Sequence, residues 1–397
     1  MLYFPEASTP NSCIFLTITV YYKKISRKVK EHDTKQPSET RNCALVVVRI
    51  FAFFSVVSIH FFSHAGYYNA TNDSIGMYCA TLTRTFFRVC VPLFIILSGY
   101  LMGKKSPSAS YYKKIIPILA EYFLASMCCA IFNYFQQGMP AGIFLFGKTQ
   151  LLGLFSYSTA PYGWYVEMYI GLFLLIPYLN ILYNNLGTKS SKQSLIVTML
   201  VITSIPSITN SLSFDLAGEA VYFRMLPQWW TGIYPITYYF IGTYLREYPI
   251  QFSNTKNILL ILLATLISGS FCYWKCYQLS FDWGIWQTNE SIFTVIQALL
   301  VFSFLLQLPY TRLTKYKNIL SYLSGRCFVA YLVSSILDSI MYPILSRFFN
   351  MDTFRLELFA IAVPAVFIGS LALSTAIHGV SRFTARIFMQ IKTIHTH

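Results

Sequence analysis

The sequence predicts an all-α, polytopic integral membrane protein with about ten transmembrane helices and both termini in the cytoplasm. Only 11% of the 397 residues are charged, whereas a soluble domain carries roughly 25%. Hydrophobic residues make up 55% of the chain and aromatic residues 18%, so too few polar side chains remain to cover a water-facing surface. The 30 Lys and Arg outnumber the 15 Asp and Glu and gather in alternate segments between the apolar stretches.

Each predicted span follows from its length and composition. A helix needs about 20 apolar residues to cross the bilayer, because it rises ~1.5 Å per residue through a core ~30 Å thick. No long run alternates as the strand of a membrane barrel does. The candidate spans cover approximately residues 43–62, 87–102, 115–135, 162–183, 194–212, 232–246, 257–277, 291–308, 327–346 and 357–378. The second and sixth are short.

The distribution of basic residues orients these spans. With the N-terminus inside, most Lys and Arg fall in cytoplasmic segments, as the positive-inside rule requires. The outer loops then hold only Arg84, Lys148, Arg224, Lys275, Arg347 and Arg355. Because the positive charge is spread over many segments, with no single patch, nucleic acid is excluded as a partner. We expect residues 1–42 to form a cytoplasmic or interfacial extension and residues 43–390 to form the transmembrane domain.

Ionisable side chains inside a membrane are costly and therefore mark candidate functional sites. Arg49 and His60 lie in the first span, eleven residues apart. At 100° per residue they share nearly one helix face, ~16 Å apart along the axis. This arrangement favours a cation near the inner end of the helix and a titratable imidazole near the outer end. The alternative is that Arg49 snorkels inward and His60 sits at the interface.

Three carboxylates also fall within spans, namely Glu121, Glu167 and Asp338. A catalytic imidazole needs a partner that fixes its tautomer and stabilises its protonated form. The predicted topology puts Glu167 and Asp338 in the outer half with His60, so either could serve. The alternative is a purely structural hydrogen bond or ion pair for each.

One motif is set aside. Residues 142–149, GIFLFGKT, satisfy the phosphate-loop expression G-x-x-x-x-G-K-[ST]. That motif works between a strand and a helix in a compartment that contains nucleotides, whereas here it falls in a predicted outer loop with bulky apolar residues at its variable positions. We interpret it as an interfacial segment, and we expect neither a metal site nor a permanently bound cofactor.

Three segments, read in order, resemble the membrane-bound acyltransferase-3 family, whose members acylate surface polysaccharides. Residues 49–60, RIFAFFSVVSIH, are similar to its R-x10-H first helix, and residues 88–101, RVCVPLFIILSGYL, to its VPLFFxxSGYL segment. Residues 164–177, WYVEMYIGLFLLIP, resemble a helix of the branch that includes the enterobacterial common antigen O-acetyltransferase. The chain departs from the family pattern at Val46, Tyr169, the Lys113 and Lys114 loop, and Ser334.

The resemblance implies an O-acyltransferase of the bacterial inner (cytoplasmic) membrane. Its donor would be cytoplasmic acyl-CoA, most simply acetyl-CoA, and its acceptor a hydroxyl of a surface polysaccharide such as O-antigen, or of its lipid-linked precursor. We expect His60 to act as general base or transient acyl carrier, with Arg49 binding the donor and Glu167 or Asp338 assisting. The predicted substrate-binding residues are Arg88, Ser98, Gly99, Lys104, Lys105, Lys113, Lys114 and Trp164, with the four lysines at the inner mouth where CoA phosphates arrive.

A polysaccharide flippase or other multi-span transporter is the competing class, because ten spans with intramembrane charges and proline-broken helices would also serve transport. No internal repeat of the kind common in transporters is visible, and acyl transfer accounts better for the Arg49 and His60 pair. The outer loop around Asp215, Glu219 and Arg224 is a plausible platform for the acceptor.

Overall fold

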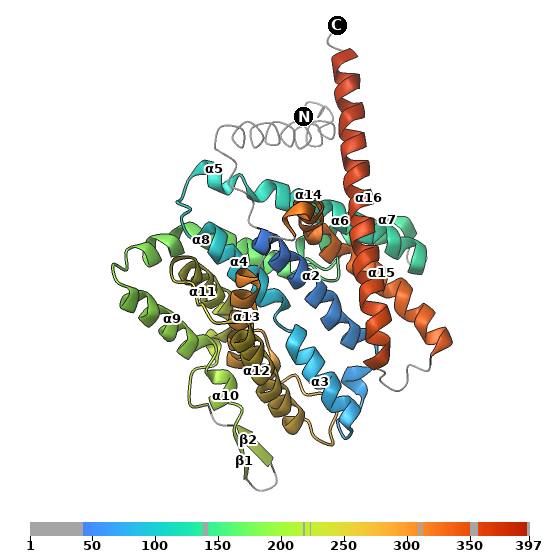
Figure 1. The fold of residues 1–397 in the computed structure, drawn as a ribbon. Coiled ribbons are helices and arrows are strands. Elements are labelled where there is room, and N and C mark those ends of the chain that lie inside the picture. Colours follow the sequence, from blue (N-terminus) through green and yellow to red (C-terminus); the bar gives the residue numbers. More distant parts are fainter. Residues whose placement is uncertain are drawn as a thin grey trace, which may run out of the picture.

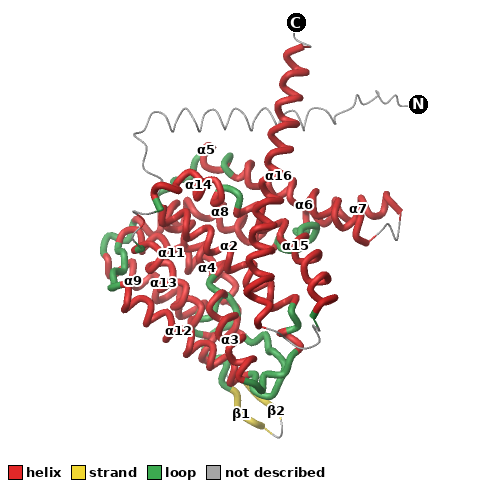
Figure 2. Tube along the Cα trace, turned by 45° about the vertical axis from the view of Figure 1, so that its right-hand side comes forward, coloured by secondary structure: helices red, strands yellow, loops and turns green. Residues whose placement is uncertain are grey.

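The computed structural model describes residues 43–137, 142–216, 219–222, 224–308, 310, 313–349 and 356–394. Within these ranges the chain is a bundle of helices with one two-stranded hairpin, as Figures 1 and 2 show. The antiparallel hairpin pairs β1 (Ser213–Leu216) with β2 (Glu219–Tyr222). The predicted extension, residues 1–42, lies outside the described residues.

The helices alternate with short connections along the whole described chain. They are α2 (Cys43–His64), α3 (Ile75–Phe87), α4 (Cys90–Met102), α5 (Ala109–Tyr112), α6 (Ile115–Gln137), α7 (Gly142–Phe155), α8 (Trp164–Asn184), α9 (Lys189–Thr203), α10 (Pro206–Thr209), α11 (Tyr234–Glu247), α12 (Asn254–Lys275), α13 (Ile292–Gln307), α14 (Lys317–Ser324), α15 (Cys327–Phe348) and α16 (Phe359–Ile394). Short 3-10 turns cover Tyr67–Asn69, Trp229–Ile233, Ile285–Gln287, Thr314–Tyr316 and Leu356–Leu358.

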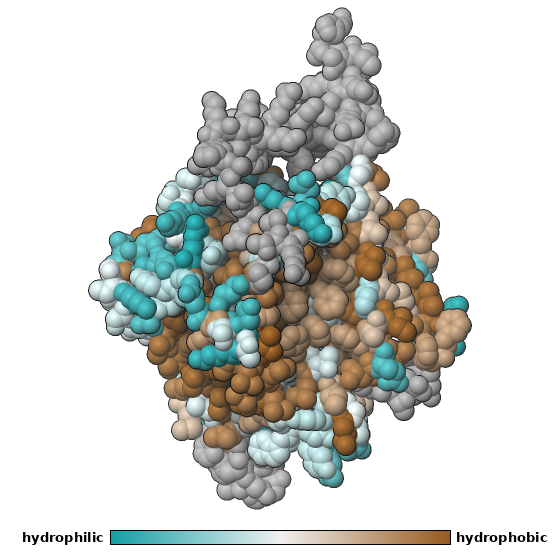
Figure 3. Space-filling view, in the orientation of Figure 1, coloured by the Kyte–Doolittle hydropathy of each residue, from teal (hydrophilic) through white to brown (hydrophobic). Residues whose placement is uncertain are grey.

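In the described part of the chain, nine helical segments are long and apolar enough to cross a membrane. The remaining predicted span corresponds to α11, which has only 14 residues. Large apolar side chains such as Leu259, Leu262 and Ile368 are more than half exposed, which a lipid environment explains. Figure 3 shows this surface as a broad hydrophobic zone, with hydrophilic residues gathered mainly at the upper left. The prediction of an all-α polytopic membrane protein is therefore confirmed.

The second span differs from its predicted form, because a further helix precedes it. Ser74 caps α3, its hydroxyl accepting a hydrogen bond from the Met77 amide at 3.2 Å. We expected Arg84 in an outer loop, but it lies in α3 with a side chain that is 1% exposed. It donates to the Gln287 amide oxygen at 3.0 Å, and its guanidinium lies 4.2 Å from the centre of the Phe281 ring. These partners replace the water that a charged side chain would otherwise need.

Helices α4 and α11 make the closest helix contact that we describe. A Cβ added to Gly99 would lie 2.1 Å from the Tyr239 carbonyl oxygen, and one added to Gly242 would lie 2.0 Å from the Ile96 carbonyl oxygen. The Thr243 hydroxyl donates to the Gly99 carbonyl oxygen at 3.3 Å. Small residues at the contact allow the two backbones to touch, as in other membrane helix pairs, and this contact fixes α4 next to the site described below.

The phosphate-loop pattern has a different structural setting from the one its mechanism requires. Residues 142–149 form the first half of helix α7 rather than a loop. Phe144 and Phe155 of α7 are at least 80% exposed. Such a helix fits the predicted apolar, interfacial interpretation and offers no cradle of backbone amides for a phosphate.

Candidate active site

His60 and Asp338 lie together, although they come from opposite ends of the sequence. His60 is near the end of α2, and Asp338 is in the middle of α15, which packs against α2. Nδ1 of His60 lies 3.7 Å from Oδ2 of Asp338. The Asp338 side chain is 1% exposed and that of His60 is 16% exposed. Because Nδ1 faces the carboxylate, Nε2 is the ring nitrogen left for a reacting group.

Tyr162, in the turn before α8, completes this cluster. Its hydroxyl donates to Oδ2 of Asp338 at 2.7 Å and lies 3.2 Å from Nε2 of His64. Its ring stacks on the His60 imidazole, with ring centres 3.7 Å apart and planes inclined by 29°. The Tyr331 hydroxyl in turn donates to the Tyr162 carbonyl oxygen. The imidazole thus has a buried carboxylate 3.7 Å from Nδ1, which is beyond hydrogen-bond distance, and an aromatic ring stacked on one face.

A cavity of about 360 Å³ opens on the Arg49 side of this cluster. Its wall includes Arg49, Glu121 and Ser98, together with the aromatic rings of Tyr165 and Tyr169. Arg49 donates from Nη1 to the Ser324 hydroxyl at 3.2 Å. We call this the inner cavity. Ser324, the last residue of α14, lines it, and α14 and α5 lie at the end of the molecule where the sequence predicts the cytoplasmic side (Figure 1).

A second cavity of about 260 Å³ opens on the His60 side. We call it the outer cavity. It is lined by Val56, Ile59, His60, Ser63, Tyr68, Arg88, Cys90, Val91, Trp164, Trp283, Asn289 and Tyr331. Four aromatic residues and the polar side chains of His60, Ser63, Arg88 and Asn289 share its wall, and a combination of aromatic rings with a few polar groups is typical of small-molecule sites.

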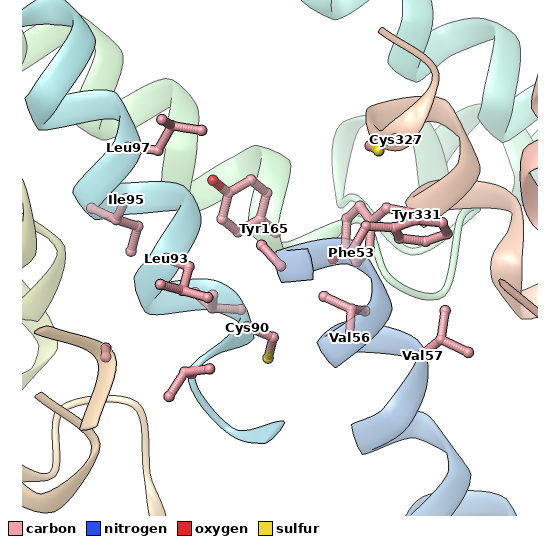
Figure 4. Close-up of a cluster of buried hydrophobic side chains, with 14 of the residues drawn as sticks. Phe53, Val56, Val57, Cys90, Leu93, Ile95, Leu97, Tyr165, Cys327 and Tyr331 are labelled. Carbon is pink, nitrogen blue, oxygen red and sulfur yellow. The ribbon is translucent and has the colours of Figure 1, made fainter. Parts of the chain in front are cut away.

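The two cavities meet at one layer of side chains. Val56, Val91 and Tyr331 line both of them. Figure 4 shows this region, with Val56 on α2 and Tyr331 on α15 on one side and Cys90 on α4 on the other. A group that reaches this layer from the inner cavity would come close to the His60 ring. The arrangement is suited to two substrates that enter from opposite ends and react between them.

Other predicted residues occupy a range of positions around these cavities. Arg88 and Trp164 line the outer cavity, and Ser98 lines the inner one. Gly99 packs against α11 instead of facing a cavity. Glu167 is exposed on α8, away from the His60 and Asp338 cluster, and Glu121 lies 3.6 Å from His378.

The four predicted lysines adjoin, in the chain, helices that line the inner cavity, but none of the four lines it. Lys104, Lys105, Lys113 and Lys114 are exposed. The first two follow α4, whose Leu101 and Met102 line the inner cavity, and the other two precede α6, whose Ile118 and Glu121 do so. The hairpin of β1 and β2, which contains Asp215 and Glu219, projects at the lower end of the molecule in Figure 1.

Three residues of the cluster were not singled out as site residues by sequence reasoning. His64 lies one helical turn after His60, so the repeated histidine was a usable signal. Tyr162 falls at the start of a predicted span, and nothing in one sequence shows that it reaches Asp338. Tyr331 lies in a segment noted as departing from the family pattern, and its position between the cavities depends on packing.

Comparison with known proteins agrees with this geometry at the level of the family. A family described as "Acyltransferase domain" matches residues 44–379, which includes both cavities and the whole cluster. No curated protein and no solved structure matches the chain. The match covers most of the sequence and begins and ends within the transmembrane part. The chain is therefore a multi-pass membrane protein of the acyltransferase-3 family.

Proposed function

We propose that the protein transfers an acyl group, most simply acetyl, from cytoplasmic acyl-CoA to a hydroxyl of a surface polysaccharide or its lipid-linked precursor. One observation carries this proposal: His60, with Asp338 and Tyr162 beside it, lines the outer cavity, and that cavity shares Val56, Val91 and Tyr331 with the inner cavity. Pairs of a histidine and a carboxylate also serve as proton relays in transporters, so the family match, rather than the pair alone, favours acyl transfer over transport.

In the proposed reaction His60 acts as the base. Nε2 takes the proton of the acceptor hydroxyl while the oxygen attacks the thioester carbonyl carbon, and the carbon-sulfur bond then breaks. The imidazolium returns the proton to the leaving thiolate, so the products are the ester and free CoA. Asp338 holds the Nδ1 proton and stabilises the positive charge on the ring, as the acid does in other His and Asp pairs.

A second route uses the same residues. Nε2 of His60 would first attack the thioester carbonyl carbon, and the carbon-sulfur bond would break to release the CoA thiolate. The acceptor oxygen would then attack the same carbon as the bond to Nε2 breaks, and the hydroxyl proton would pass by way of the ring to the thiolate, with Asp338 beside Nδ1 throughout. Both routes need the donor carbonyl near the layer formed by Val56, Val91 and Tyr331. They differ in whether the acyl group becomes attached to the protein before the acceptor arrives.

The inner cavity supports a role in donor binding. Arg49 is its cation, and its hydrogen bond to Ser324 directs the guanidinium. The exposed Lys104, Lys105, Lys113 and Lys114 supply positive charge where the CoA phosphates would lie. The apolar wall of Phe94, Leu97 and Leu101 suits a thin pantetheine arm and keeps water from the thioester.

The inner membrane of a bacterium and a surface glycan acceptor complete the proposal. They rest on the resemblance of the three segments above and on the orientation that the basic residues predict. The decisive experiment replaces His60 with Ala, checks that membrane abundance is unchanged, and measures ester-linked acyl groups on surface glycans by NMR. Full acylation in that variant would exclude the catalytic assignment. An unacylated glycan exported at normal levels would exclude the flippase.

A further inference from the structure

The outer cavity contains Arg88, a cation that has no counter-ion among the residues the structure describes. Arg88 lies in the break between α3 and α4 and lines the cavity beside His60. Its Nε is buried without a hydrogen-bond partner. Among the described residues no carboxylate pairs with Arg88, and none lines the outer cavity. A guanidinium held in a low-dielectric site without an anion is costly, so the site is built to receive one.

A second arginine adds to the positive potential. Arg84, one turn before Arg88 on α3, lies behind two rings of the cavity wall. Its Nε donates to the Tyr68 hydroxyl at 3.2 Å, and its guanidinium lies 5.8 Å from the centre of the Trp283 ring. Helix α4 also begins at the outer cavity, with Cys90 and Val91 in the wall. The positive end of its dipole therefore adds to the positive potential of the cavity.

The nearby acids do not cancel this charge. Asp338 is engaged by Tyr162 and lies against His60. Asp282 and Glu290 flank the cavity residues Trp283 and Asn289 in the chain, but neither lines the cavity or forms an ion pair with Arg88. The cavity thus combines a base, a free cation and the exposed rings of Trp164 and Trp283. At about 260 Å³ it is at the small end of ligand sites.

We infer that the acceptor is an anionic sugar, one that carries a carboxylate or a phosphate close to the hydroxyl that is acylated. Arg88 binds the anion with its planar fork of donors, the aromatic rings pack on the apolar faces of the ring, and His60 reaches the hydroxyl. This inference rests on the proposed function, since it names the substrate class of the same site. The anion is either part of the sugar or the diphosphate of a lipid-linked precursor.

The test compares full-length variants expressed in the native cell and matched for membrane abundance. Arg88→Gln is expected to lower glycan acylation on the order of 10- to 100-fold, because it removes a charge-assisted contact. Arg88→Lys keeps the charge and should retain more activity. Arg347→Gln, which removes an exposed arginine of α15 that lines neither cavity, is the matched control and should leave acylation unchanged. Binding of a radiolabelled, non-hydrolysable acetyl-CoA analogue to membranes should be equal in all four proteins.

NMR then identifies the acylated residue in the mature glycan and in the extracted lipid-linked intermediate. An ester on a uronic acid or phosphorylated sugar supports an anion on the sugar itself, and an ester confined to the sugar next to the lipid diphosphate supports the precursor. An ester on a neutral sugar with no adjacent anion, or full acylation by Arg88→Gln, overturns the inference. If His60→Ala acylates as the wild type does, the proposed function fails instead, so the two failures are distinguishable.

Discussion

Nδ1 of His60 lies 3.7 Å from Oδ2 of Asp338, and the same oxygen accepts the hydrogen bond of Tyr162 at 2.7 Å. The contact joins the first apolar helix to one near the end of the chain, and it brings together two groups that are expensive to bury separately. Oδ1 of Asp338 is buried and has no hydrogen-bond partner among the described residues. The carboxylate can therefore accept a further hydrogen bond when the imidazole turns toward it or becomes charged.

Asp338→Asn tests whether this carboxylate orients and stabilises the imidazole. Asn has nearly the same shape but no charge, so the ring loses its electrostatic partner during proton transfer. We expect the acyl-transfer rate to fall by about 10²- to 10⁴-fold, by analogy with other His and Asp pairs, while acyl-CoA affinity stays the same. The rate is measured with radiolabelled acetyl-CoA in membranes. Asp73→Asn, at an exposed carboxylate, is the control, and a rate within twofold of the wild type for Asp338→Asn would contradict the assignment.

How far the sequence predicts this cluster depends on the type of signal. Arg49, His60 and Asp338 are predictable, because the cost of a charge in a membrane makes each one conspicuous in an apolar stretch. The sequence does not predict that Asp338, rather than Glu167, is the partner of His60, because that choice depends on α15 packing against α2. That packing is encoded by many apolar contacts that look alike in a single sequence.

Tyr162 and Arg84 show two other limits. The chain has 30 tyrosines, and nothing local separates the one that hydrogen-bonds to Asp338 from those in the lipid-facing belt. Arg84 is predicted in an outer loop because it precedes the second predicted span, residues 87–102. Its burial depends on Gln287 and Phe281, which are distant in the chain and reach it only after α12 packs on α3.

Tyr162→Phe tests the contribution of the Tyr162 hydroxyl separately from that of its ring. The variant keeps the stacking on His60 but loses the hydrogen bonds to Asp338 and His64. We expect roughly a tenfold lower acyl-transfer rate, because the lost bond is to a charged group. Tyr162→Ala should lower the rate further, since the imidazole also loses its stacking partner. Tyr277→Phe, at an exposed ring, serves as the control. Equal rates for Tyr162→Phe and wild type would show that the hydroxyl does not support the cluster.

Arg49→Ala tests the division between the two cavities. If Arg49 binds the donor, its loss should raise the KM for acyl-CoA by about 10- to 100-fold and leave the KM for the acceptor unchanged. Ser324→Ala removes the hydrogen bond that directs the guanidinium, and we expect a smaller rise of about 2- to 10-fold. Steady-state kinetics with each substrate varied in turn provide the measurement. A rise confined to the acceptor KM would reverse the assignment of the inner cavity.

The contact between α4 and α11 predicts a stability effect that is independent of chemistry. Gly99→Ala puts a methyl carbon 2.1 Å from the Tyr239 carbonyl oxygen, and Gly242→Ala puts one 2.0 Å from the Ile96 carbonyl oxygen. Both distances are far shorter than a van der Waals contact. Backbone atoms cannot turn aside as a side chain can, so the helices must separate, at a cost of about 1–3 kcal/mol or more. Thermal unfolding of the detergent-solubilised protein, followed by size-exclusion chromatography, measures the change. Gly171→Ala is the matched control, because nothing lies within 4 Å of its Cβ and alanine favours the helix. If both buried-glycine variants unfold at the wild-type temperature, the close approach of α4 and α11 is wrong, and with it the geometry of the cavity wall that α4 supplies.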